Sequence, residues 1–183
     1  MGYADQFAGF KADWLNSWQG MADMLGYVGT ALTSNAWPAA MQNDAYISRV
    51  WNPEPFEASF AYLMNGTTPG GNIDIGVYTE SGEKIIATGA TAQVGANQTQ
   101  FISIVKTVIP SGVLLLALAA DTGGVQFMRP NVTTPSFPAG MLAAYGWAQA
   151  AASMPLPGSL PDPLIEATAS VIPPMFGLIR RWP

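Results

Sequence analysis

Carboxylates are the residues of this sequence whose type and spacing come nearest to a catalytic set. Glu54 and Glu57 are close enough in sequence to face one groove. Two carboxylates about 5–10 Å apart are the catalytic pair of many glycan-cleaving enzymes. Glu80 and Glu83 flank a predicted hairpin turn and Asp121 begins another turn, where a solvated or capping role explains an acidic residue. An enzyme acting on cell-wall polysaccharide is therefore the last of three hypotheses.

Composition removes most other catalytic chemistry. The chain contains no cysteine and no histidine. It therefore has no disulfide framework, no thiol nucleophile, and neither the commonest general base nor the commonest transition-metal ligand. No phosphate-binding GxxxxGK[ST] motif is present, and no GxGxxG opens a helix. A calcium site made of Asp and backbone oxygens stays open, although no DxDxDG loop occurs. We expect no enzyme activity, no cofactor and no metal.

The middle of the chain, residues 72–121, predicts the β-structure that would position any such groups. Alternation of apolar and polar residues over 73–78 is the two-residue period of a half-buried strand. Gly82 can adopt the left-handed conformation that a short hairpin turn requires. Residues 113–120 are apolar on both faces, which predicts a central strand covered on both sides. Together with strands at 84–88 and 98–109, the stretch predicts a β-meander, in which consecutive strands are neighbours.

The remaining sequence predicts more short strands separated by Gly, Pro and Asn turns. Strands are expected at 45–51, 56–64, 125–129, 141–147 and 175–179. The proline-rich residues 153–163 should be extended chain lying over a surface. We therefore predict an all-β fold, an antiparallel β-sandwich or jelly-roll over residues 33–183, preceded by an N-terminal amphipathic helix within residues 1–32.

Large apolar side chains recur every three or four residues in the N-terminal segment, residues 1–32, as on one face of a helix. This stripe consists of Tyr3, Phe7, Phe10, Trp14, Trp18, Met21 and Leu25. Each such side chain gains about 1.5–3 kcal/mol on burial, so the stripe needs a surface to cover. That surface is the chain's own sheet, sister copies in an oligomer, or another protein. A membrane surface is disfavoured because the polar face is acidic.

Low charge suggests a surface partly covered by partners. Hydrophobic residues make up 49% of the 183 residues and charged residues 10%, with a net charge of −5. The usual charged fraction is about 25%. The seven basic residues form no patch, which argues against nucleic acid as a partner. No apolar run is long enough to insert into a membrane and no secretory signal is evident, so synthesis in the cytoplasm is expected.

Four tryptophans outside the stripe are candidates for contact with a glycan, because aromatic faces stack on sugar rings. They are Trp37, Trp51, Trp147 and Trp182. For each of them, core packing or contact between subunits is a commoner explanation than sugar binding. A sugar-binding surface would require two or more of them exposed together, beside amide or carboxylate side chains.

Three pieces of the sequence resemble a pattern found in virion proteins of tailed bacteriophages. They are Gly70-Gly71-Asn72-Ile73-Asp74-Ile75-Gly76-Val77-Tyr78, Ala87-Thr88-Gly89-Ala90-Thr91-Ala92-Gln93-Val94-Gly95 and Ala117-Leu118-Ala119-Ala120-Asp121. Met154-Pro155-Leu156-Pro157 and Ile172-Pro173-Pro174 are similar to the proline-marked tail of that group. The sequence departs from the pattern at Leu114–Leu116, where the group usually has aromatic residues.

The resemblance covers residues 45–183 and brings no catalytic motif. It implies a non-enzymatic β-sandwich in the tail, collar or capsid surface of a phage, assembled as a homo-oligomer, with a trimer favoured. The first hypothesis is therefore a structural virion protein that docks on the particle, or on sister copies, through its N-terminal stripe. The second is a carbohydrate-binding module of a tail fibre or spike that attaches to a host-surface glycan.

Overall fold

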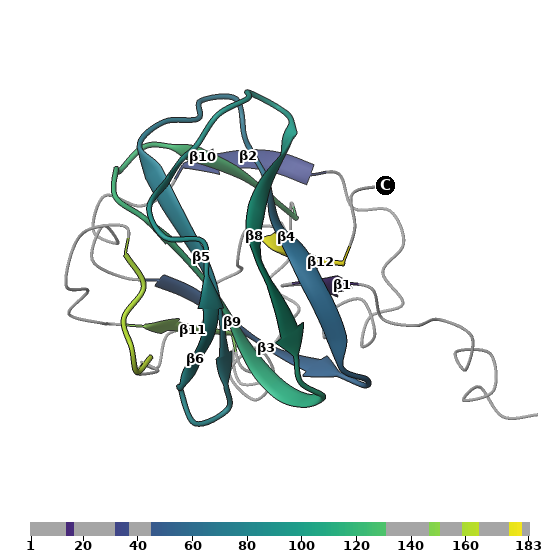
Figure 1. Cartoon of the computed structure of the whole chain (residues 1–183). Helices are drawn as coiled ribbons and strands as arrows, with labels where there is room; N and C mark the ends of the chain where they lie inside the picture. Colours follow the sequence, from purple (N-terminus) through teal and green to yellow (C-terminus); the bar gives the residue numbers. More distant parts are fainter. Residues whose placement is uncertain are drawn as a thin grey trace, which may run out of the picture.

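The computed structural model describes residues 14–16, 32–36, 45–130, 147–150, 159–164 and 176–180. All regular elements in these ranges are β-strands, and every strand pair is antiparallel (Figure 1). The predicted all-β, antiparallel class is thus confirmed for this part of the chain. No helix in the described residues is long and apolar enough to cross a membrane.

The strands form two larger sheets and one small one. The four-stranded sheet has the order β1 (Trp14–Asn16), β12 (Phe176–Ile179), β4 (Phe56–Met64), β8 (Thr99–Ile109). The six-stranded sheet has the order β11 (Trp147–Ala150), β3 (Ala45–Asn52), β9 (Gly112–Ala120), β5 (Asn72–Thr79), β6 (Lys84–Ala87), and β7 (Thr91–Ala92) also pairs with β5. At one end, β10 (Gln126–Pro130) pairs with β2 (Leu32–Ala36) (Figure 1).

The chain passes from one larger sheet to the other between β3 and β4, between β4 and β5, and between β8 and β9, so the predicted β-meander is wrong. Of its four strands only β5 and β6 are joined as a hairpin, whereas β8 pairs with β4 in the other sheet and β9 lies between β3 and β5. The difference in burial between β8 and β9 explains this. Strand β9 is buried on both faces, so it fits a central position in a sheet whose two faces are both covered by other parts of the chain. Strand β8 has several exposed side chains, so it fits the edge of a sheet.

One hydrophobic core lies between the two larger sheets. Leu116 and Leu118 of β9 belong to the same buried cluster as Ala58 and Leu63 of β4. Leu15 of β1 is also fully buried in this cluster. The core therefore includes a residue from the N-terminal segment.

A second apolar layer covers the outer face of the six-stranded sheet. Leu115 and Ala117 on that face of β9 are buried in one cluster with Leu160 and Leu164. Residues 159–164, which we call the covering segment, lie across this face without forming a strand and bend at residues 162–163. Strand 113–120 is thus covered on both sides, as predicted, and the described part of the proline-rich stretch lies over a surface, as predicted.

The N-terminal helix prediction is wrong for Trp14–Asn16, which form strand β1 paired with β12. The helical spacing leaves Leu15 off the apolar stripe, but burial of Leu15 between the sheets favours the alternation of a strand, because tertiary packing outweighs local periodicity. The other stripe residues lie outside the described part of the chain: Tyr3, Phe7, Phe10, Trp18, Met21 and Leu25. The strand predicted at 141–147 is observed at Trp147–Ala150, and residues 141–146 are not described.

Candidate functional site

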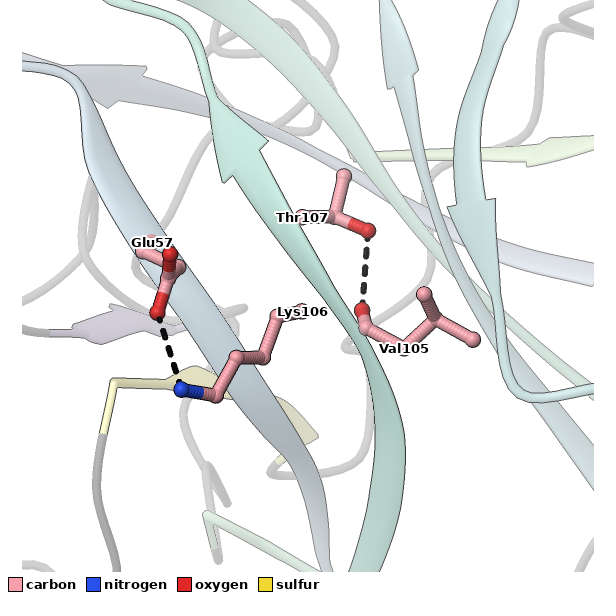
Figure 2. A network of polar contacts seen from close by, with 4 residues as sticks. All are labelled: Glu57, Val105, Lys106 and Thr107. Atoms are coloured by element: carbon pink, nitrogen blue, oxygen red, sulfur yellow. Dashed lines mark hydrogen bonds and ion pairs between the residues drawn. The ribbon is translucent and has the colours of Figure 1, made fainter.

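The carboxylate pair considered for catalysis lies on the surface. Glu54 and Glu57 are both exposed, and the Glu57 carboxylate is 3.6 Å from Nζ of Lys106 on β8 (Figure 2). The two carboxylates therefore lie in solvent, and the carboxylate of Glu57 is engaged by a lysine, so they do not form an enclosed acid/base pair. Within the described ranges, no group of three or more acidic side chains is arranged to hold a metal ion.

Two Ser-x-x-Lys spacings were missed by the sequence reasoning, although a Ser–Lys pair can act as nucleophile and base. In the first, the Ser81 hydroxyl bonds Thr79, and Nζ of Lys84 donates to the Leu160 carbonyl oxygen at 3.0 Å. In the second, Ser103–Lys106, the lysine pairs with Glu57. Both lysines therefore have other partners, and neither spacing forms a catalytic pair in the structure.

The residues that resemble the phage pattern meet at one end of the six-stranded sheet. The carboxylate of Asp121, which directly follows β9, accepts hydrogen bonds from the backbone N–H and the side-chain amide of Asn72, both at 2.7 Å. Burial works against ionisation of Asp121, but these bonds and one from the Thr122 hydroxyl favour it more, and together they lower the pKa of the carboxyl. A Cβ atom at Gly71 would collide with the Asp121 and Thr122 side chains, and φ there is +62°. Glycine is therefore required at this position.

The second part of this arrangement is centred on Gln93, whose side chain is buried. Its amide oxygen accepts from Gly70 N at 2.9 Å, and its amide nitrogen donates to Asn65 Oδ1 at 2.8 Å and to the Gln126 carbonyl oxygen at 3.0 Å. Every polar atom of this side chain is used within the protein. We call Gly70, Asn72, Gln93 and Asp121 the structural lock, because their hydrogen bonds hold β5, β9 and β10 together.

Side chains of β5 and β6 hold the covering segment. The buried carboxylate of Asp74 accepts from Leu160 N at 3.0 Å, and the Tyr78 hydroxyl donates to the Pro161 carbonyl oxygen at 2.8 Å. Burial, with a smaller effect from the negative charges of Asp74 and Asp162, raises the pKa of Tyr78, so its hydroxyl stays protonated and able to donate. The segment therefore stays in place through both apolar and polar contacts.

The structure describes the side chain of one of the four tryptophans proposed for glycan contact. Trp51 on β3 is 59% exposed. Arg49 lies two residues earlier on the same strand, and its Nη1 is 3.5 Å from Oε1 of Glu80. Trp147 is in β11 opposite Ser48, but its side chain is not described, and Trp37 and Trp182 lie outside the described residues. The structure thus gives one exposed aromatic ring beside a guanidinium–carboxylate pair.

Comparison with known proteins adds no identification. No family model matches the sequence, and no curated protein matches it.

Proposed function

We propose that this chain is a structural, non-enzymatic component of a bacteriophage virion, in the tail, the collar or the capsid surface. It assembles through its N-terminal segment and displays a β-sandwich of jelly-roll type. The observation that carries the proposal is the strand order of the two larger sheets.

In a jelly-roll, successive strands pass from one sheet to the other, so that sequence neighbours face each other across the core. In the orders β1-β12-β4-β8 and β11-β3-β9-β5-β6, the connections β3–β4, β4–β5 and β8–β9 follow this rule, whereas β5 and β6 form a hairpin within one sheet. The first strand, β1, lies beside the last, β12. Jelly-rolls are common in viral capsid proteins and in lectins, which connects the fold to both the structural and the glycan-binding hypothesis. This connection is an analogy at the level of the fold.

The structural lock supports the resemblance to phage proteins. The pieces of the pattern are far apart in sequence, yet Gln93 is hydrogen-bonded to Gly70 and Gly71, and Asp121 is hydrogen-bonded to Asn72. When the residues of a sequence pattern contact one another in the folded chain, the pattern is specific to that fold. Matches at residues that do not contact one another carry no such information. The resemblance is therefore support for a shared architecture.

Substitutions in the N-terminal segment test the proposal without removing β1. Deleting residues 1–30 would also remove the buried Leu15, so the better variant replaces Phe7, Phe10 and Trp18 by serine. We expect the wild-type chain to form an oligomer and this variant to lose the N-terminal contact, as measured by light scattering after gel filtration. The matched control replaces Asp5 and Lys11 by serine and should keep the mass. Identical masses for all three proteins would refute assembly through this segment.

Membership of a virion has its own test. Particles purified from a phage that encodes this chain should contain it as a stoichiometric component in mass spectrometry. Its absence from intact particles would exclude a structural role in the virion.

The exposed ring of Trp51 favours a second candidate function, attachment to a host-surface glycan. An aromatic ring beside Arg49 and Glu80 offers a stacking face together with hydrogen-bonding groups for hydroxyls. The Trp51→Ala variant should lose binding to a glycan array while Trp51→Phe keeps part of it. Binding that is equal in wild type and Trp51→Ala would exclude this surface.

A further inference from the structure

One buried tyrosine lies on the outer face of the four-stranded sheet. Ala61 and Leu63 of β4 belong to the core cluster between the two larger sheets, so Tyr62 between them points to the opposite face, because side chains alternate along a strand. Tyr62 is nevertheless only 8% exposed, and it belongs to neither of the two buried apolar clusters of the described residues. Its burial therefore requires a cover on the outer side of this sheet.

Two phenylalanines flank Tyr62 on this face. Tyr62 pairs with Phe101 on β8 and with Gly177 on β12. The ring centroids of Tyr62 and Phe101 are 6.4 Å apart, and a Cβ atom on Gly177 would come within 2.9 Å of Cε1 of Tyr62. Phe60 lies two residues before Tyr62 on β4, and both phenylalanines are half-buried. We define Phe60, Tyr62 and Phe101 as the aromatic face.

The described strands and the covering segment do not account for this cover. The six-stranded sheet packs on the inner side, the covering segment lies on the far face of the six-stranded sheet, and β2 and β10 lie at one end (Figure 1). Burial raises the pKa of the Tyr62 hydroxyl well above its ordinary value, as expected for a ring shielded from water. The structure holds one copy of the chain, so the cover belongs to that copy.

The first thirteen residues begin close enough to the aromatic face to cover it. They directly precede β1, which is the edge strand of this sheet opposite β8. Three inter-strand spacings, about 14 Å, separate β1 from β8, whereas residues 1–13 would span about 20 Å as a helix and more as extended chain. They carry Tyr3, Phe7 and Phe10 at the spacing of one helix face.

We propose that residues 1–13 cover the aromatic face of their own chain. A tethered segment has an effective concentration on the order of millimolar, so in micromolar solution it outcompetes the same segment of another copy. The contact buries aromatic rings of the segment and of the sheet against each other. It goes beyond the proposed function and refines it. The part of the N-terminal segment before β1 packs on its own sheet, and contact with other copies is left to the part after β1.

The absence of cysteine from the sequence allows a cross-linking test. Along a helix, Ala4 would lie about 14 Å from residue 13, which places Ala4→Cys near Ser103→Cys. Ser103 is exposed on β8 and pairs with Phe60. With a short bis-maleimide at low micromolar protein, we expect linked single copies of this double variant.

The matched control is Ala4→Cys/Ser81→Cys, because Ser81 is exposed at the turn between β5 and β6 of the other sheet. It should link far less. Equal linking of the two double variants would overturn the inference. Linked dimers in place of linked single copies would assign the cover to another copy and would overturn it too, while supporting assembly through the N-terminal segment.

Dye binding tests the cover without assuming a helix. Deleting residues 2–12 keeps β1 with its buried Leu15 and should uncover the aromatic face. We expect a several-fold increase in the fluorescence of anilinonaphthalene sulfonate, and a much smaller increase when the same deletion is made in a Phe60→Thr/Phe101→Thr background. Unchanged fluorescence after the deletion, or an equal increase in both backgrounds, would overturn the inference. The mass of the full chain tests the proposed function separately, because a single copy would refute assembly and leave this cover intact.

Discussion

Two neighbouring leucines of β9 test whether the covering segment forms a core layer of its own. Leu116 is buried between the two larger sheets, and Leu115 is buried on the opposite face, in the cluster that includes Leu160 and Leu164. Their exposed fractions are 0% and 1%. Truncation of a buried leucine to alanine costs about 2–5 kcal/mol, depending on how far the surroundings collapse into the space.

We expect Leu116→Ala to lower the free energy of unfolding by about 3–5 kcal/mol and Leu115→Ala to lower it by about 2–3 kcal/mol. The difference arises because a single covering segment can move into the space left by the truncated side chain more easily than two sheets can. The assay is denaturant unfolding at one fixed protein concentration, so that any oligomerisation contributes equally. Val94→Ala is the exposed control and should stay within about 0.5 kcal/mol of wild type.

A double-mutant cycle of Leu115→Ala with Leu160→Ala tests whether the Leu115 side chain packs against Leu160 of the covering segment. Residues in contact show coupling of about 0.5–3 kcal/mol, whereas distant residues are additive. A loss below about 1 kcal/mol for Leu115→Ala would place this side chain at the surface and refute the second apolar layer.

Two further substitutions test polar contacts of the same sheet. Tyr78→Phe removes the hydroxyl that donates to Pro161 and should cost about 0.5–1.5 kcal/mol in denaturant unfolding; unchanged stability would mean that this bond does not hold the covering segment. The lowered pKa of Asp121 adds stability above the ordinary value of 3.8, and this stability is lost as the pH falls through the folded-state value. The difference in urea midpoint between wild type and Asp121→Asn should therefore shrink in acid, and a difference that is constant over this range would contradict the role of the carboxylate.

The sequence predicted individual strands well, because burial leaves a local pattern. The apolar run of β9 indicated a strand covered on both faces. The alternation in β5 indicated its span, but the prediction that β5 is half-buried is wrong, because the covering segment buries its second face as well. Gly82 has φ of +87°, as expected for its turn. The pairing of strands was not predictable in this way. The turn at Gly112 suits a hairpin and a crossing between sheets equally, so β8 and β9 were wrongly placed side by side.

The exposure of single side chains was harder to predict than the strands. In a regular strand, Val105 and Val108 would point to opposite faces, because side chains alternate. The bulge in β8 changes this alternation and leaves both exposed. Gln93 and Asn65 were not identified either, because their role depends on loops that meet only after the sheets form.

The central claim is that this chain is a part of an assembly, and its mass in solution tests that claim most directly. One copy has a mass of 19.3 kDa. Light scattering of the purified full-length chain should give a whole-number multiple of this mass, two or more, and the N-terminal serine variant should give a lower mass. A mass of one copy for the wild-type chain across the micromolar range would contradict the account.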